Sequence, residues 1–296
     1  GLKLGIYSSP GTLTCGGYAG SYQHEAQDAQ TYSRWGIDYL KYDWCSYGQI
    51  APANPSLQEY KKPYLVMQDA LQKNNRDIIY SLCQYGMGDV WKWGAEIGAS
   101  SWRTTGDITD TWPSLSSIGF TQDKSAPYTQ PGHFNDPDML VVGKVGWGPA
   151  LHNTRLSPDE QYTHISLWSL LSAPLLIGCD MNQLDDFTIN LLTNDEILAI
   201  DQDALARPAV RILDKDHLQV WIKELEDGSK AVGIFNLSDS SSQPTIDFST
   251  IKLAAELKLR DVWKQKDLGT YKKSFIAAIP AHGVLLRNAK TVAASR

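Results

Sequence analysis

Short apolar runs alternate with longer amphipathic stretches through the first two thirds of the chain. The apolar runs predict strands, because a strand that is buried on both faces reads as a short continuous hydrophobic segment. We expect strands at residues 2–8, 38–44, 77–83, 101–106, 133–142 and 174–179. The intervening stretches predict helices at residues 23–35, 56–74, 90–97, 113–119 and 158–172, with a sixth helix that starts at Thr193.

Helix-boundary signals support several of these predicted helices. Gly36 directly follows the helix at residues 23–35, as a C-terminal glycine often does. Ser157 precedes Pro158 and lies three residues before Glu160, which predicts a capping box with proline in the first turn. Thr193 and Glu196 have the same spacing, so the sixth helix is expected to begin there.

Alternation of strands and helices at this spacing predicts parallel βα units, either in a doubly wound sheet or in a (β/α)8 barrel. No GxGxxG follows the first strand, which removes the commonest reason to choose a dinucleotide-binding sheet. Reactive side chains occur where several strands end, as in TIM-type barrels. These are Asp43, Cys83, Arg103 with Asp107, Asp138 and Asp180. Six units are recognisable, whereas a closed barrel needs eight.

The pattern changes after about Ala206, where apolar and polar residues alternate and a turn is expected at Asp227 and Gly228. Strict alternation predicts antiparallel strands with one solvated face. We therefore expect a partial catalytic barrel at residues 1–207 and a C-terminal antiparallel β domain at residues 208–296.

Composition narrows the function. The chain of 296 residues has a net charge of −6, which disfavours nucleic acid and anionic membranes as partners. No apolar run reaches the length of roughly 18 to 20 residues that a membrane-spanning helix needs. Ten Trp and fourteen Tyr against six Phe suit stacking on sugar faces, although a Trp-rich core accounts for most of them.

The four cysteines, Cys15, Cys45, Cys83 and Cys179, match no zinc-binding spacing. Four thiols can form two disulfides, one or none. The cysteine count alone therefore leaves the redox compartment open.

Lys41 and Asp43 lie on the same side of the strand at residues 38–44, because side chains alternate along a strand. A neighbouring ammonium stabilises an ionised carboxylate, which is the form that a covalent nucleophile or a general base requires. A buried ion pair without catalytic purpose has the same sequence signature. A Schiff-base lysine at Lys41 is a further alternative, less favoured because Asp43 would keep that amine charged.

Asp107 follows a glycine in the loop after the strand at residues 101–106. A carboxyl close to a like charge is pushed toward protonation, so Asp107 facing Asp43 would suit an acid/base role. Asp110 competes for this role but is expected to cap the helix that follows it. Asp136 and Asp138 flank Pro137 and form a D-x-D pair, which suits sugar hydroxyls better than a metal ion.

Six segments occur in an order that resembles glycoside hydrolase family 27, the family of α-galactosidases and α-N-acetylgalactosaminidases. They are "GLKLGIYSSPGTLTC", "YLKYDWC", "SLCQYG", "SWRTTGDI", "NDPDML" and "SAPLLIGCDM". The closing "PAHGVLLR" extends the resemblance over nearly the whole chain. The resemblance implies a TIM-type barrel with a C-terminal β-sandwich and a retaining exo-glycosidase that releases terminal α-galactose.

In this resemblance Asp43 matches the nucleophile and Asp107 the general acid/base. The two carboxyl groups are then expected about 5 to 5.5 Å apart, as in other retaining enzymes. The positions that match sugar-binding residues are Lys41, Cys15, Cys83, Tyr85, Arg103, Asp138 and Met139. No cofactor and no metal ion are expected.

The resemblance also implies a disulfide between Cys15 and Cys45, which favours a secreted, periplasmic, lysosomal or vacuolar enzyme. Cys83 and Cys179 are expected to be free thiols. Cys83, Gln84 and Tyr85 look like the galactosidase version of a loop in which N-acetylgalactosaminidases have small residues. A bulky wall there is expected to exclude an acetamido group.

One departure from the family is expected to matter. Family members have two βα units before "GLKLGIY", and these units are absent from the sequence. The exposed barrel edge would then favour a homo-oligomer or a complementing N-terminal segment. The alternatives to an active α-galactosidase are a weakened or non-catalytic α-galactoside-binding protein and an α-N-acetylgalactosaminidase.

Overall fold

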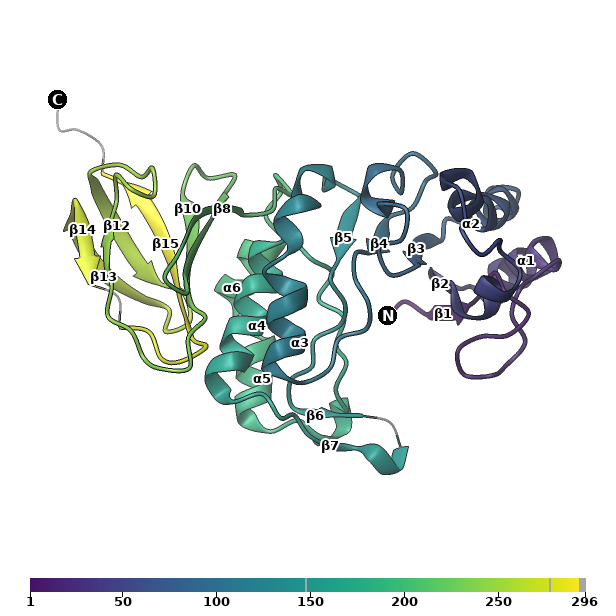
Figure 1. Ribbon diagram of the computed structural model, residues 1–296, viewed down its shortest axis with the longest axis horizontal. Coiled ribbons are helices and arrows are strands. Elements are labelled where there is room, and N and C mark those ends of the chain that lie inside the picture. Colours follow the sequence, from purple (N-terminus) through teal and green to yellow (C-terminus); the bar gives the residue numbers. More distant parts are fainter. Residues whose placement is uncertain (147, 277, 293–296) are drawn as a thin grey trace. The chain divides into compact units, whose positions relative to one another are not determined.

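The computed structural model describes residues 1–146, 148–276 and 278–292 (Figure 1). The chain divides into two compact units. The first comprises Gly1–Asp107 and Gly132–Asp136, and the second comprises Ile108–Pro131 and Pro137–Arg296. No helix in the described ranges is long and apolar enough to cross a membrane.

A parallel sheet in the order β1-β2-β3-β4-β5 forms the centre of the first unit. Its strands are β1 (Gly5–Ser8), β2 (Tyr39–Asp43), β3 (Ile79–Cys83), β4 (Ser101–Arg103) and β5 (Phe134–Asp136). They are connected by α1 (Glu25–Trp35), η1 (Cys45–Gln49), α2 (Leu57–Gln72) and η2 (Val90–Lys92). The predicted parallel βα units are therefore confirmed for these strands.

Alternation within β2 separates the core from the polar side of this sheet. Tyr42 is fully buried and lies against the rings of Tyr64 from α2 and Tyr80 from β3. The helix α2 begins with a capping box in which Ser56 and Glu59 satisfy each other's backbone N–H groups. Because Tyr42 points into this aromatic core, Lys41 and Asp43 point to the other side.

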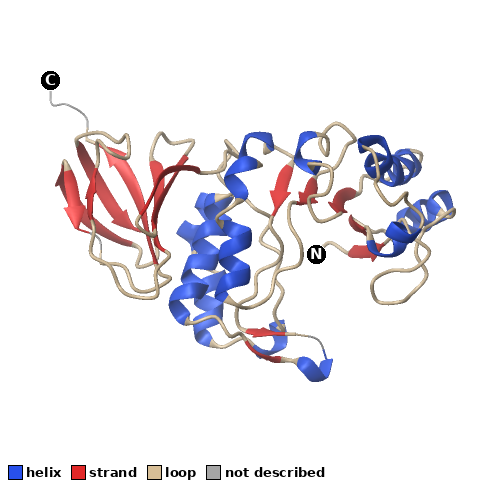
Figure 2. Cartoon of the chain, in the orientation of Figure 1, coloured by secondary structure: helices blue, strands red, loops and turns tan. Residues whose placement is uncertain are grey.

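The second unit begins with helices and ends with strands (Figure 2). Its helices are α3 (Trp112–Gly119), α4 (Pro158–Leu170), α5 (Asp186–Leu192) and α6 (Asp195–Asp201). Its short 3-10 turns are η3 (Gln122–Lys124), η4 (Ala126–Tyr128), η5 (Gly148–Ala150) and η6 (Met181–Gln183). A small hairpin pairs β6 (Lys144–Val145) with β7 (His152–Asn153). The capping box at Ser157 and Glu160 is confirmed at the start of α4.

The predicted antiparallel β domain is present as a six-stranded sheet in the order β13-β12-β15-β10-β9-β8, with a separate pair β11-β14. The strands are β8 (Val210–Lys215), β9 (Leu218–Glu224), β10 (Lys230–Asn236), β11 (Thr245–Asp247), β12 (Glu256–Asp261), β13 (Lys266–Lys272), β14 (Ser274–Ile276) and β15 (Val284–Thr291). The expected turn at Asp227 and Gly228 connects β9 to β10, and Gly228 has a φ of 79°.

Helix α4 is the central element of the core of the second unit. Nearly every residue of α4 is buried, including Trp168 and Leu170. Phe120, Trp221 and Phe235 belong to the same apolar cluster, which joins helices α3 to α6 to strands β9, β10 and β15. One face of the C-terminal sheet thus shares a core with the helices, while a second apolar cluster, which includes Ile234, Phe248 and Leu257, lies within the β domain.

Four predicted elements differ from the structure. Residues 174–179 form no strand and contribute only an isolated parallel bridge between Leu140 and Ile177. Residues 90–97 form the short η2 followed by turns, because Gly94 packs flat on the ring of Trp102 and has low helix propensity. The strand at residues 133–142 ends at Asp136, since Pro137 has no N–H for the ladder.

The fourth difference concerns the sixth predicted helix. Asn194 caps α6, accepting hydrogen bonds from the backbone N–H groups of Glu196 and Ile197. Thr193 instead ends α5, a helix that was not predicted. Asn is at least as good an N-cap as Thr, so the Thr193–Glu196 spacing was misleading.

His282 from the "PAHG" segment connects three elements of the second unit. Its ring stacks on Trp112 with the ring centroids 4.1 Å apart and an interplanar angle of 10°. Nδ1 lies 2.7 Å from Glu160 of α4, and Nε2 lies 2.9 Å from Asp239. The His282 carbonyl also accepts a hydrogen bond from Thr163. This segment therefore fastens the β domain to helices α3 and α4.

We predict that His282→Ala lowers the free energy of unfolding by about 2 kcal/mol, because it removes the ring stacked on Trp112 and the partner of Oε1 of the poorly exposed Glu160. The Glu160 side chain is 11% exposed, whereas that of Asp239 is 98% exposed. Asp239→Ala should consequently change the stability by less than about 0.5 kcal/mol. Urea denaturation of both variants measures the difference, and equal losses would contradict the proposed importance of the Glu160 contact.

Candidate active site

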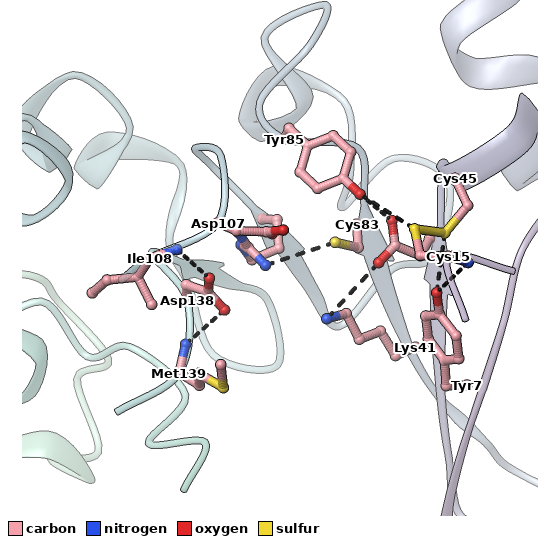
Figure 3. A network of polar contacts seen from close by, with 12 residues as sticks. Tyr7, Cys15, Lys41, Cys45, Cys83, Tyr85, Asp107, Ile108, Asp138 and Met139 are labelled. Atoms are coloured by element: carbon pink, nitrogen blue, oxygen red, sulfur yellow. Dashed lines mark hydrogen bonds and ion pairs between the residues drawn. A yellow bond between two sulfur atoms is a disulfide. The ribbon is translucent and has the colours of Figure 1, made fainter. Parts of the chain in front are cut away.

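Asp43 ends strand β2 with its carboxylate buried and held by two neighbours, Tyr85 and Lys41, which are labelled in Figure 3. The Tyr85 hydroxyl donates a hydrogen bond of 2.7 Å to Asp43 Oδ1. Lys41 Nζ lies 4.0 Å from Asp43 Oδ2. The predicted proximity of Lys41 and Asp43 is confirmed, and each oxygen of Asp43 has a different polar neighbour.

Tyr85 reaches Asp43 because the loop after β3 turns sharply. Tyr85 has a φ of 61° and Gly86 a φ of 81°. A Cβ at Gly86 would lie 2.2 Å from the carbonyl oxygen of Thr104, so only glycine fits there. The pKa of the Tyr85 hydroxyl is raised mainly by burial and, to a smaller extent, by the hydrogen bond to Asp43. The hydroxyl therefore stays protonated and donates its hydrogen bond to the carboxylate.

The predicted disulfide between Cys15 and Cys45 is present beside this pair. Tyr7 holds it from below: the Tyr7 hydroxyl accepts a hydrogen bond from the backbone N–H of Cys15 and lies 3.0 Å from Cys45 Sγ. The Tyr85 hydroxyl lies 3.9 Å from Cys15 Sγ. The disulfide thus joins the loop after β1 to the end of β2, directly at Asp43.

Tyr7 was not selected from the sequence. The available signal was its position near the end of the first predicted strand, the place where site residues collect in barrels. In the sheet, Tyr7 pairs in register with Lys41, and Lys41 pairs with Ser81. The side chains of Tyr7, Lys41 and Ser81 therefore lie on the same side of the sheet, which is the side of the site.

Arg103 is a buried charged residue at the end of strand β4, beside the end of strand β3. Its Nη1 lies 3.8 Å from Cys83 Sγ, and its Nη2 donates to Asp107 Oδ1 at 3.0 Å. The guanidinium also packs near the Tyr85 ring, 5.9 Å from its centroid. Burial raises the pKa of the Cys83 thiol, so this group stays protonated and uncharged at neutral pH.

Asp107 lies on the loop after β4, and its side chain is 76% exposed. Asp107 forms an ion pair with Arg103, and its predicted position facing Asp43 stays a prediction. It also does not cap a helix. Its exposure leaves the carboxyl open to solvent and to a bound molecule.

The predicted helix-capping role of Asp110 is wrong. Asp110 is buried and accepts hydrogen bonds from the backbone and guanidinium of Arg155, with His152 also 3.2 Å away. Although burial opposes it, the bonds from Arg155 lower the pKa of the Asp110 carboxyl. The sequence contained no signal for a partner 45 residues away.

Asp138 and Met139 belong to the second unit and follow strand β5 in the chain. The carboxylate of Asp138 accepts hydrogen bonds of 2.8 Å from the backbone N–H groups of Ile108 and Met139. Trp168 donates to the Asp138 carbonyl at 2.7 Å. Asp138 has a φ of 95°, and these contacts hold it in that conformation. The Asp138 carboxylate is therefore hydrogen-bonded to Ile108, the residue that follows Asp107 in the chain.

Cys83 and Cys179 are free thiols, as predicted. Cys179 is partly buried, and burial raises the pKa of its thiol as well. Cys83 lies beside Arg103, whereas Cys179 packs against the core of the second unit.

Comparison with known proteins identifies the family. Residues 1–203 match the sequence pattern described as "Alpha galactosidase A". Residues 215–288 match the pattern described as "Alpha galactosidase C-terminal beta sandwich domain". The boundary predicted at residue 207 stays a prediction.

Individual relatives agree with these matches. A probable α-galactosidase of Dictyostelium discoideum is 38% identical over 97% of this chain and 71% of its own length. α-Galactosidase 2 of Arabidopsis thaliana is 40% identical over 95% of this chain and 67% of its own. The crystal structure of α-galactosidase I from Mortierella vinacea superposes with a TM-score of 0.90 at 32% identity, over all of this chain and 78% of the other.

Both patterns together match most of the chain, and the relatives share its parallel sheet and its C-terminal β-sandwich. The chain belongs to glycoside hydrolase family 27, the α-galactosidases.

Proposed function

We propose that the chain releases terminal α-galactose with retention of configuration, with Asp43 as nucleophile and Asp107 as general acid/base. The observation that carries this proposal is the state of Asp43, a buried carboxylate fixed by Tyr85 at the end of a barrel strand. A fixed carboxylate of this kind is suited to attack on an anomeric carbon.

In the first step Asp43 attacks the anomeric carbon while the bond from that carbon to the leaving oxygen breaks. Asp107 gives its proton to the leaving oxygen. The Lys41 ammonium and the Tyr85 hydroxyl orient the two oxygens of Asp43, so that one lone pair is directed at the sugar.

In the second step water attacks the same carbon and displaces Asp43, while Asp107 accepts the proton of that water. Arg103 suits this exchange, because its hydrogen bond to Oδ1 holds the Asp107 carboxyl in position through both steps. The high exposure of the Asp107 side chain supports access to both the leaving group and water.

We further propose that Lys41, Arg103, Asp138 and Met139 contact the sugar, with Cys15 and Cys83 forming part of the wall. In this proposal Cys83, Gln84 and Tyr85 form the wall beside Asp43, which is supported by the full burial of Cys83 and Gln84 and by the hydrogen bond from Tyr85 to Asp43. Such a wall leaves little room for a 2-acetamido group, which favours galactose over N-acetylgalactosamine. The disulfide supports an extracytoplasmic location for the enzyme.

The proposal predicts different consequences for the two carboxylates. Asp43→Asn should abolish hydrolysis of both nitrophenyl α-galactoside and methyl α-galactoside, because no covalent intermediate can form. Asp107→Asn should lower kcat/KM for methyl α-galactoside by about 10²- to 10⁴-fold. It should slow cleavage of the nitrophenyl bond much less, since that leaving group needs little protonation. Steady-state rates of the unmodified protein and both variants measure these differences.

Added azide sharpens the assignment, because it replaces the missing carboxylate without needing general-base help. The Asp107→Asn variant should yield α-galactosyl azide, and the Asp43→Asn variant should yield β-galactosyl azide. NMR of the product distinguishes the anomers. If Asp43→Asn hydrolyses both substrates like the unmodified protein, the assigned nucleophile is wrong.

The role of Tyr85 can be divided between its ring and its hydroxyl. Tyr85→Phe keeps the wall but removes the hydrogen bond to Asp43, so kcat should fall about 10- to 100-fold while N-acetylgalactosaminide stays excluded. Tyr85→Ala should also admit the larger sugar, which lowers the ratio of kcat/KM between nitrophenyl α-galactoside and its 2-acetamido analogue. An unchanged ratio in Tyr85→Ala would show that another part of the site selects the sugar.

A further inference from the structure

Beside the proposed nucleophile lies an unusual set of potential metal ligands. Cys15 Sγ, Cys45 Sγ and a carboxylate oxygen of Asp43 all lie within 4.8 Å of one another. In the structure the two sulfurs are bonded as a disulfide, whose Cα atoms are 5.1 Å apart. Disulfide sulfurs carry no charge and are poor ligands, so the set is inactive in this state.

We propose that reduction of this disulfide creates a binding site for a thiophilic divalent cation such as Zn²⁺ or Cd²⁺, with Cys15, Cys45 and Asp43 as ligands. Two thiolates and one carboxylate are a suitable ligand set for zinc, with water in the fourth position. Zinc–sulfur bonds of about 2.3 Å and zinc–oxygen bonds of about 2.0 to 2.2 Å fit within a cluster of this size.

The surroundings hold two of the three ligands in place without the disulfide. Asp43 is fixed by the hydrogen bond from Tyr85, and Cys45 follows it by two residues at the start of η1. The Tyr7 hydroxyl lies beside Cys45 Sγ and also accepts the backbone N–H of Cys15. Cys15 is exposed, which gives a cation access from solvent.

The charges also balance. Two thiolates, one carboxylate and a divalent cation have a net charge of −1, and the Lys41 ammonium lies 4.0 Å from Asp43. A nearby ammonium stabilises such a negative cluster. The same ammonium disfavours binding of a cation to the carboxylate alone, so the thiolates are needed.

Formation of the site requires a two-electron reductant, for which a trialkylphosphine is suitable because it does not itself chelate zinc as dithiols do. The phosphorus gives two electrons to the sulfur–sulfur bond and takes an oxygen atom from water. The two protons of that water go to the sulfurs. When the cation binds, both thiol protons are released to the solvent.

Occupation of the site would stop hydrolysis, because the cation takes a lone pair of the carboxylate that attacks the sugar. This consequence rests on the proposed role of Asp43, whereas the binding itself does not. The disulfide would then serve a second purpose besides fastening two loops: it keeps the nucleophile away from thiophilic metals.

The test measures metal binding first. Phosphine-treated and untreated protein are titrated with Cd²⁺ against a chromophoric chelator, and Co²⁺ is added separately to detect thiolate-to-cobalt charge-transfer absorption. We expect one equivalent to bind to the reduced protein with both readouts, and none at this site in the oxidised protein. Cys179→Ala, which removes a free thiol of the second unit, should leave that binding unchanged.

Asp43→Asn distinguishes the proposed site from simple thiol binding. Loss of this ligand should weaken Cd²⁺ affinity of the reduced protein by about 10- to 100-fold or more. If Asp43→Asn and the unmodified protein bind equally, Asp43 is not a ligand and the proposal is overturned. Equal binding is also the outcome if reduction unfolds the chain, because unfolded thiols bind without regard to Asp43.

Activity is measured last, in the oxidised and the reduced protein, each with and without Zn²⁺. Metal should abolish hydrolysis of nitrophenyl α-galactoside only after reduction, and removal of Zn²⁺ by a chelator should restore it. Persistent activity of the zinc-loaded reduced protein would overturn the inhibitory role. An inactive oxidised, metal-free protein would instead contradict the proposed function, while the binding titration still tests the metal site.

Discussion

The parallel register of strands β1 to β5 is the constraint on which the site depends. In this register Tyr7 pairs with Lys41, Asp43 with Cys83 and Arg103 with Asp136. Parallel strands end at the same edge, so residues from distant parts of the chain meet there without long connecting loops. A slip of one residue in β2 would exchange Tyr42 and Asp43 between the aromatic core and the site. The fully buried Tyr42 ring therefore fixes the direction of the Asp43 carboxylate.

Arg103 shows how the fold accommodates a charge at the base of the site. A buried guanidinium is costly unless it is paired and hydrogen-bonded. Asp107 supplies the countercharge from a loop that is otherwise exposed, so the same pair neutralises Arg103 and anchors the proposed acid/base. Cys83, the Tyr85 ring and the Thr105 carbonyl also lie close to the guanidinium. Burial of one charge thus positions a second charge that must stay accessible.

Much of this arrangement was predictable from local pattern. Alternation placed Lys41 and Asp43 on one side of a strand, and the ordered motifs matched Cys15 and Cys45 as a disulfide. Prediction failed where a distant partner decides the structure. Asp110 was predicted to cap a helix, but it is hydrogen-bonded to Arg155. The predicted cap at Thr193 is instead provided by Asn194. Tyr7 was missed because nothing local distinguishes a tyrosine that supports a disulfide from one that fills a core.

The Asp43 carboxylate is restrained by contacts from three directions. Tyr85 and Lys41 approach different oxygens of the carboxylate, and the disulfide encloses it from the side of Cys45. Each of these contacts comes from a different element, namely the loop after β3, the strand β2 and the loop after β1. A carboxylate restrained from three directions loses little entropy when it attacks, which is the condition for an effective nucleophile. Because the restraint on one side is covalent and reducible, the precision of this site is coupled to the redox state of two sulfur atoms.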